Sequence, residues 1–243
     1  MDAKFLHATV LTQNDRREVI DDGGVAVVGG RIAAVGPSAE IERKHPTLPT
    51  VELSGKALMP GLVNAHTHVL LLVLRGTVED MGAEAIYGYM SPISFAMNDD
   101  ERRALALLGV AEALRSGTGT LVEPFRHVVN YAGAMAQTGM RLWFAENCAD
   151  ALTLKIRHGI YEFDQAWGET FLARQRALIE KFHDTHDARV QCQRDGGAYP
   201  VRRQRHVGSA FPPVTIPFTR FTPCRRLVSR AAATCTTAHA ARA

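Results

Sequence analysis

Short runs of apolar residues near the start of the chain predict β-strands. Residues 8–11 form one run, and residues 24–28 and 31–35 form two more, separated only by Gly29 and Gly30. Because glycine tolerates the positive φ of a tight turn, this arrangement predicts a β-hairpin. Such a hairpin specifies a turn and no chemistry, so it indicates a structural segment.

From residue 98 onward, segments with helical spacing alternate with short β-rich runs. One helix is predicted to begin after Asn98, because Glu101 three residues later is typical of a capping box, and to end at Ser116. Its apolar residues recur at helical spacing: Ala104, Leu107, Leu108, Ala111 and Leu114. The other expected elements are helices over residues 127–137 and 165–183 and strands over residues 118–122, 141–145 and 189–193. This alternation is typical of βα units and a parallel sheet.

The composition changes abruptly at residue 194. Residues 194–243 contain nine arginines, no lysine, five prolines and one acid, Asp195. The tail therefore carries +8, while residues 1–193 carry 19 − 24 = −5, which together give the net charge of +3. The arginines are scattered, with no helical face and few aromatic neighbours, so we expect no nucleic-acid partner. The apolar run over residues 69–74 is too short to span a bilayer, and we expect no membrane partner.

Three explanations are open for this tail: a disordered basic extension, a small module, or an out-of-frame reading of a GC-rich gene. We favour the third, because shifted GC-rich codons yield Arg, Pro, Ala and Thr, and because lysine disappears together with the acids. An irregular tail is expected in the first and third cases.

Two histidines stand one residue apart after an apolar run, in the segment Pro-Gly-Leu-Val-Asn-Ala-His-Thr-His over residues 60–68. In an extended strand, residues i and i+2 point to the same face, so His66 and His68 would direct both imidazoles to one place. Neutral imidazole is a favoured ligand of zinc and iron. A His-x-His pair alone is often only a surface pair, and two ligands do not complete a catalytic site.

This segment, with the strand and Gly-Lys turn before it, resembles the start of the catalytic barrel in the amidohydrolase superfamily. The resemblance implies an α/β fold with the first half of a (β/α)8 TIM-type barrel, preceded by part of a small β-sandwich. The domains would be residues 1–58 (sandwich part), residues 59–193 (first four barrel strands) and the irregular tail. It also implies that His66 and His68 bind one divalent metal ion, with zinc preferred to iron. The third histidine ligand would follow on the fifth barrel strand, beyond the recognisable sequence.

Two features favour the deaminase and chlorohydrolase branch. Residues 74–80, Leu-Arg-Gly-Thr-Val-Glu-Asp, are similar to a segment of enzymes that act on amino-substituted heterocycles, although a helix end at Gly76 is the simpler interpretation. Branches with two metals use a carboxylated lysine on the fourth strand, and residues 188–193 contain none. The resemblance therefore implies one metal ion and a small heterocyclic substrate.

Two carboxylates at strand ends are further candidates. Glu123 ends the run Thr-Leu-Val-Glu and would point toward the mouth of a barrel, where it could act in catalysis; the simpler alternative is an ion pair with Arg126. Glu146 has the same ambiguity. The four cysteines show no metal or disulfide spacing, and the N-terminus lacks the apolar region of a signal peptide, so a cytoplasmic location is expected.

The function expected from the resemblance is hydrolysis of carbon–nitrogen bonds other than peptide bonds. A metal-activated water would attack an amino- or chloro-substituted heterocycle. We expect this chain to be truncated and inactive by itself, because the later metal ligands are absent, whereas an intact parent could form homo-oligomers. The alternative is a non-catalytic, amidohydrolase-like fragment or scaffold.

Overall fold

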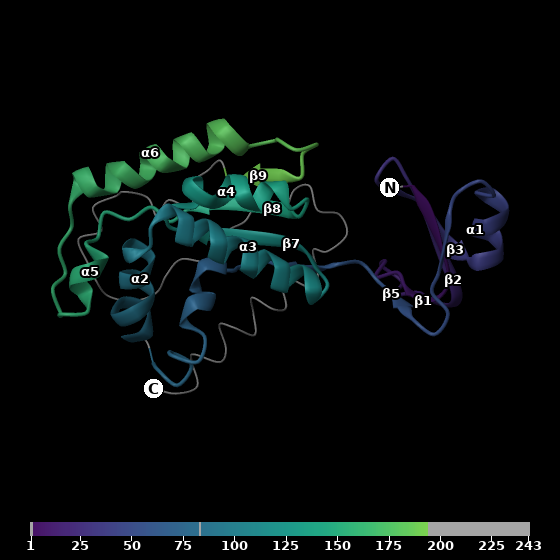
Figure 1. Cartoon of the computed structure of the whole chain (residues 1–243), viewed down its shortest axis with the longest axis horizontal. Coiled ribbons are helices and arrows are strands. Elements are labelled where there is room, and N and C mark those ends of the chain that lie inside the picture. Colours follow the sequence, from purple (N-terminus) through teal and green to yellow (C-terminus); the bar gives the residue numbers. More distant parts are fainter. Residues whose placement is uncertain (1, 83, 194–243) are drawn as a thin grey trace. The chain divides into compact units, whose positions relative to one another are not determined.

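The computed structural model describes residues 2–82 and 84–193, so the expected irregular tail lies outside the described residues. The chain divides between Pro60 and Gly61 into two compact units. Both contain strands and helices, which gives a mixed α/β fold (Figure 1). No helix in the described ranges is long and apolar enough to cross a membrane.

The first unit is a sheet with one helix on it. The sheet order is β3-β2-β1-β4, and β5 also pairs with β1. The β1–β2 and β2–β3 pairs are antiparallel, while β4 and β5 run parallel to β1. Its elements are β1 (Ala3–Leu11), β2 (Val19–Val28), β3 (Arg31–Pro37), α1 (Ser38–Lys44), β4 (Thr50–Glu52) and β5 (Ala57–Leu58). The predicted hairpin is confirmed as β2 and β3, and both glycines between them have positive φ, +58° and +73°.

A bulge in β1 lets the side chains of this strand pack into two separate hydrophobic clusters. The register with β2 shifts between Phe5 and Ala8, and His7 has φ of +61°. Without the bulge, Leu6 and Ala8 would share a face, because strand side chains alternate. Instead Leu6 packs with Ala26 and Ile41, whereas Ala8 packs with Val10 and Val25.

The second unit is built on a sheet of four parallel strands in the order β6-β7-β8-β9. These strands are β6 (Leu62–Asn64), β7 (Thr118–Phe125), β8 (Arg141–Glu146) and β9 (Val190–Cys192). The predicted strands are confirmed, although β7 and β8 extend further toward their carboxyl ends. Those ends lie at one edge of the sheet, which is where α/β folds place ligands.

Helical segments connect the strands and lie along the sheet (Figure 1). Between β6 and β7 lie η1 (Val69–Leu74), η2 (Ile86–Met90), α2 (Ser91–Ala96) and α3 (Asp99–Arg115). The β7–β8 connection holds α4 (Val128–Gln137), and the β8–β9 connection holds α5 (Thr153–Ile156) and α6 (Gln165–Phe182). The core between α3, α4, α6 and the sheet includes Leu121, Tyr131, Leu142, Phe144 and Leu178, none more than 1% exposed.

Helix α3 begins as the sequence predicted. The Asn98 side chain accepts a hydrogen bond from Glu101 N at 2.9 Å, and the Glu101 carboxylate accepts one from Asn98 N at 2.8 Å. This capping box satisfies two backbone donors that a helix start would otherwise leave unpaired.

The face of α3 that packs is not the apolar face from which the helix was predicted. The buried residues of α3 are Arg102, Ala106 and Val110. By contrast, the leucines that set the predicted pattern are 43 to 49% exposed: Leu107, Leu108 and Leu114. Small residues let the helix approach η1 closely, since a Cβ on Gly109 would lie 2.9 Å from Val69 Cβ.

Candidate metal centre

The two histidines of the motif meet just beyond the end of β6. The strand ends at Asn64, whose side chain accepts a hydrogen bond from His66 N at 3.2 Å, and Thr67 N donates to Val122 O of β7 at 2.9 Å. These bonds hold the loop against the carboxyl half of β7. Although the pair lies after the strand and not in it, the Nε2 atoms of His66 and His68 are 3.2 Å apart.

The environment of His68 keeps its imidazole neutral. Burial lowers the pKa of His68 to about 4, with smaller contributions from the positive charges of His66 and Arg126. Its ring packs on Phe125, with the centroids 4.6 Å apart. A neutral imidazole offers a nitrogen lone pair, which is what a metal ion needs.

The geometry of the pair fits a shared metal ion. Two nitrogens bound to one tetrahedral zinc at about 2.0–2.1 Å lie about 3.3–3.4 Å apart, close to the Nε2 separation of 3.2 Å. The buried His68 Nδ1 has no hydrogen-bond partner among the described residues, so it can carry the ring proton while Nε2 binds. The same separation also suits a hydrogen bond between the rings. Within residues 2–82 and 84–193, no third His, Cys, Asp or Glu completes a metal-binding group.

Glu123 lies inside β7 and is completely buried. Its Oε2 accepts a hydrogen bond from Val69 N at 3.0 Å, and its Oε1 accepts one from Tyr131 of α4 at 2.9 Å. Burial raises the pKa of Glu123 to about 8. The expectations that it points to an open mouth or pairs with Arg126 are wrong, because its carboxyl group links the residue after His68 to α4. Its role in catalysis stays a prediction.

Glu146, the last residue of β8, satisfies the start of α4. Its carboxylate accepts hydrogen bonds from the backbone N of His127 and, at 2.9 Å, from that of Val128. A carboxylate at this position interacts favourably with the helix dipole. Burial nevertheless raises the pKa of Glu146 to about 7.

Residues 74–80 connect the segment after the histidines to α3. Helix η1 ends at Leu74, and Gly76 follows with φ of +75°, so the simpler interpretation of this segment, a helix end, is confirmed. The Arg75 guanidinium donates two hydrogen bonds to Glu112 of α3, at 3.1 and 2.6 Å.

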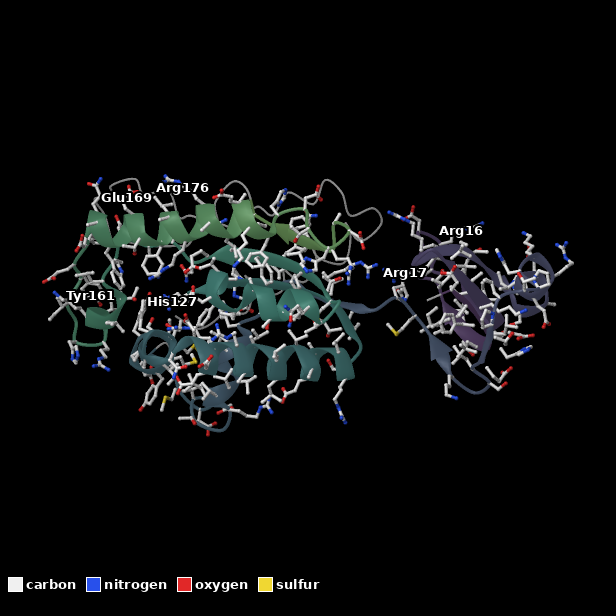
Figure 2. The ribbon with its side chains drawn as sticks, turned by 45° about the horizontal axis from the view of Figure 1, so that its top comes forward. Arg16, Arg17, His127, Tyr161, Glu169 and Arg176 are labelled. Carbon is white, nitrogen blue, oxygen red and sulfur yellow. The ribbon has the colours of Figure 1, made fainter. Side chains whose placement is uncertain are left out.

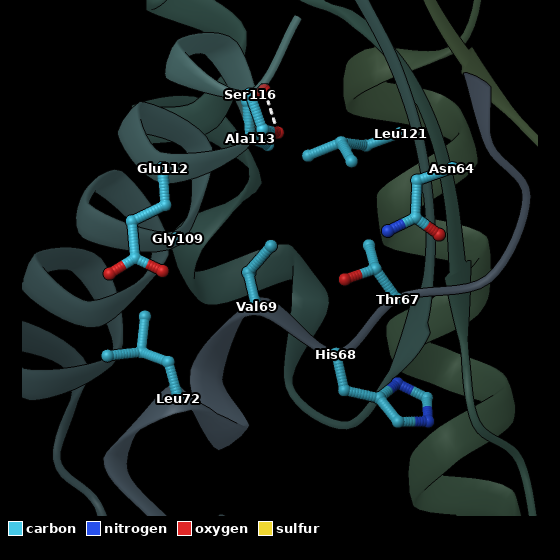
Figure 3. Close-up of a pocket in the computed structure, with 10 residues that line it drawn as sticks. All are labelled: Asn64, Thr67, His68, Val69, Leu72, Gly109, Glu112, Ala113, Ser116 and Leu121. Atoms are coloured by element: carbon cyan, nitrogen blue, oxygen red, sulfur yellow. Dashed lines mark hydrogen bonds between the residues drawn. The ribbon is translucent and has the colours of Figure 1, made fainter. Parts of the chain in front are cut away.

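A pocket of about 340 Å³ lies between α3, η1 and the end of β6. Figure 3 shows Leu72 and Glu112 on one side and Asn64 and Thr67 on the other. His68 is at its edge, with the ring turned away from Glu112. The pocket therefore adjoins the histidine pair without enclosing it.

The two described cysteines are protonated, unreactive thiols at neutral pH. Cys148 and Cys192 are free and buried, and burial raises the pKa of both thiols to about 12. Both therefore stay protonated, and a thiol is a poor nucleophile and metal ligand. As expected, His183 ends α6; its Nδ1 accepts a hydrogen bond from Cys192 N at 3.1 Å.

The sequence predicted no role in a functional site for three polar residues near the carboxyl end of β7. Arg126 and His127 directly follow the strand, and Tyr131 lies one turn into α4. Their position after a strand of a parallel sheet was a usable signal, because ligands bind at that edge. The contacts of Tyr131 could not be foreseen, since they depend on how α4 packs.

Comparisons with known proteins give the family of the chain. The amidohydrolase family matches residues 57–196, more than half of the chain, and an imidazolonepropionase-like composite domain of bacteria matches residues 23–47. A 5-methylthioadenosine/S-adenosylhomocysteine deaminase of Nitratidesulfovibrio vulgaris (strain DP4) is 39% identical over 112 residues, which cover 46% of this chain and 25% of that protein. The corresponding deaminase of Acetivibrio thermocellus is 25% identical over 183 residues, 74% of this chain and 42% of that protein.

Solved structures support the same fold. Atrazine chlorohydrolase from Arthrobacter aurescens TC1, complexed with zinc, has a TM-score of 0.63 at 18% identity and covers 78% of this chain. An adenosine deaminase from Xanthomonas campestris with bound zinc has a TM-score of 0.59 at 24% identity and covers 79%. This chain spans 45% and 42% of those two proteins, less than half of each. The chain belongs to the amidohydrolase family.

Proposed function

We propose that this chain is the N-terminal portion of a metal-dependent hydrolase that acts on carbon–nitrogen bonds of an amino- or chloro-substituted heterocycle. The observation that carries the proposal is the convergence of His66 Nε2 and His68 Nε2 to 3.2 Å beside the carboxyl end of β7. Relatives named as deaminases and a structural neighbour named as a chlorohydrolase support this reaction class. The proposed substrate is a small heterocyclic molecule.

In this proposal His66 and His68 hold one divalent ion, zinc in preference to iron. The ion, when bound, activates water for attack on an electrophilic ring carbon. Glu123 holds the backbone of Val69 directly after His68 and therefore fixes the position of that imidazole. Tyr131 in turn holds Glu123. A proton-transfer role for Glu123 is part of the proposal and requires the carboxyl group to exchange its present partners.

We further propose that β6 to β9 are the first four strands of a (β/α)8 barrel and that residues 1–58 are part of a β-sandwich. The barrel would occupy residues 59–193, and its remaining strands and metal ligands would belong to an intact parent. By itself this chain is then inactive. We place the parent in the cytoplasm, because Cys148 and Cys192 are free thiols, and propose that it assembles as a homo-oligomer.

A second candidate is a non-catalytic fragment or scaffold. It is supported by the fact that the 3.2 Å contact between the two rings also suits a hydrogen bond. In that case the histidines stabilise the loop and bind no metal ion.

Equilibrium dialysis of the full chain against zinc separates the two candidates. We expect about one zinc per chain, and loss of that zinc in the double variant His66→Asn/His68→Asn. His158→Asn is the matched control, because this exposed histidine lies on the segment after α5. Equal zinc binding by the wild type and the double variant would refute the metal site. An assay with aminopurines and aminotriazines should show no turnover by this chain.

A further inference from the structure

Within the described part of the chain, Arg126 is a nearly buried cation that forms no ion pair with a carboxylate. Its residue is 9% exposed, and its guanidinium makes one long hydrogen bond, from Nη1 to Ser94 Oγ at 3.5 Å. It lies over the Phe95 ring at 5.2 Å, which offsets only part of the cost of removing a charge from water. Four other arginines of the described residues do form ion pairs with carboxylates: Arg16, Arg75, Arg102 and Arg103.

Two further donors without partners accompany Arg126. Nη1 of Arg174 and Nε2 of His127 are buried and have no hydrogen bond within the described part of the chain. The Arg174 guanidinium lies over Phe171 at 5.1 Å. Burial lowers the pKa of His127 to about 4, with smaller contributions from the positive charges of Arg102, Arg174 and Arg126, so all three arginines are within electrostatic reach of His127. Their elements are α3, α6 and the β7–α4 connection.

The nearby carboxylates compensate the charge of this cluster only in part. Asp99 is already bound by Arg102 and by Asn130, at 2.8 Å each. Glu146 faces Arg126 and Arg174, but both of its oxygens accept hydrogen bonds from the first backbone N–H groups of α4. Two arginines therefore face one carboxylate whose oxygens each already accept a backbone hydrogen bond, and within the described residues neither arginine forms an ion pair with it. Buried charges in proteins are normally paired, and leaving one unpaired is costly.

We propose that Arg126, Arg174 and His127 form a subsite for an oxyanion, the carboxylate or phosphate group of a small-molecule substrate. Guanidinium groups match the two oxygens of such anions, and a neutral imidazole can donate a third hydrogen bond. The subsite adjoins the metal centre, because Phe125, which packs on His68, directly precedes Arg126. The assignment of the anion to a substrate rests on the proposed function. Binding of the anion itself does not, because it requires no metal ion.

The backbone of His127 adopts an unusual conformation. His127 has φ of +59°, a conformation that residues other than glycine rarely adopt, and its backbone N is held by Glu146. Strain of this kind persists where the surroundings impose it, as the hydrogen bond from His127 N to Glu146 does here. Figure 2 shows His127 on the sheet side of α6, whereas Arg176 projects from the opposite side of that helix.

Tryptophan fluorescence of the full chain can report the binding. The ring centroid of Trp167 lies 5.5 Å from that of Phe95 and 5.2 Å from that of Phe171. The guanidinium groups of Arg126 and Arg174 lie over these two phenylalanine rings. The chain is titrated in dilute solution with sodium phosphate or sodium acetate, with chloride holding the ionic strength constant. A chelator is present, so that no signal can come from an anion bound to a metal ion.

We expect a saturable change with at least one of the two oxyanions, and the tighter one identifies the substrate group as phosphate or carboxylate. Arg126→Gln and Arg174→Gln should weaken binding about tenfold or more, because each removes a charged donor. Arg176→Gln is the matched control, since it removes the same charge from an exposed position on the same helix. Its affinity should equal that of the wild type.

Several outcomes would overturn the subsite. One is a response no greater than that to chloride, and another is equal weakening by Arg174→Gln and Arg176→Gln. If the glutamine variants do not fold, Arg126→Met tests the same point by thermal unfolding in anion-free buffer. An unpaired buried charge predicts a higher midpoint for that variant, and a lower midpoint would show that Arg126 is already satisfied. If the wild-type chain binds the anion but no zinc, the metal site is refuted and the anion subsite is not.

Discussion

The hydrogen bond between Tyr131 and Glu123 can be removed with almost no change in shape. Tyr131→Phe deletes only the hydroxyl group that donates to Glu123 Oε1 at 2.9 Å, in a place where both residues are fully buried. No water can replace the lost donor without rearrangement, so one carboxyl oxygen is left unsatisfied. The cost of such a group is about 1–3 kcal/mol.

That cost is large enough to measure in a chain of this size. It corresponds to a fall in the unfolding midpoint of roughly 3–10 °C. Midpoints are compared at one scan rate and pH 7, by circular dichroism. Tyr161→Phe is the matched control, because Tyr161 is 64% exposed and the same deletion there should change stability by less than about 0.5 kcal/mol.

A double-mutant cycle ties the effect to the pair. Combining Tyr131→Phe with Glu123→Leu should cost less than the sum of the two single changes, because the second change removes the oxygen that the first leaves unpaired. Equal midpoints for Tyr131→Phe and Tyr161→Phe would refute the reasoning, as would strict additivity in the cycle.

Two further predictions concern Glu146 and Gly109. Since burial raises the folded-state pKa of Glu146 to about 7, the folded state binds more protons than the unfolded state, and this residue makes stability fall as pH rises from about 4.5 to about 7. Urea midpoints at pH 5 and pH 8 should therefore differ less in Glu146→Gln than in the wild type, and an unchanged difference would contradict this. Gly109→Ala would place a Cβ 3.0 Å from Val69 O, so it should destabilise by about 1–3 kcal/mol and weaken zinc binding. Gly133→Ala, whose Cβ would meet only the Phe182 ring at 3.7 Å, should instead stabilise α4 by up to about 1 kcal/mol; equal effects of the two substitutions would count against the packing argument.

Local signals in the sequence determined the secondary structure well. The capping pair Asn98 and Glu101 starts α3, and Gly29 with Gly30 turns the hairpin, because these residues act on their own backbone neighbours. The one-residue spacing of His66 and His68 correctly predicted that the two rings meet, although they do so in a loop after β6 that is also held by Val122 of β7. Such effects are decided within a few residues and can be read directly.

The packing of those elements was decided only by tertiary structure. Helix α3 carries apolar residues on two sides, and neighbouring segments select the side with Ala106 and Val110 and leave Leu107 exposed. The partners of Glu123 lie 54 residues before it and eight residues after it, and Glu146 holds backbone groups 18 and 19 residues earlier. Side-chain type and spacing identified these carboxylates as candidates. Their burial, pKa and partners follow from the distances that the folded sheet creates between remote segments, which no local pattern encodes.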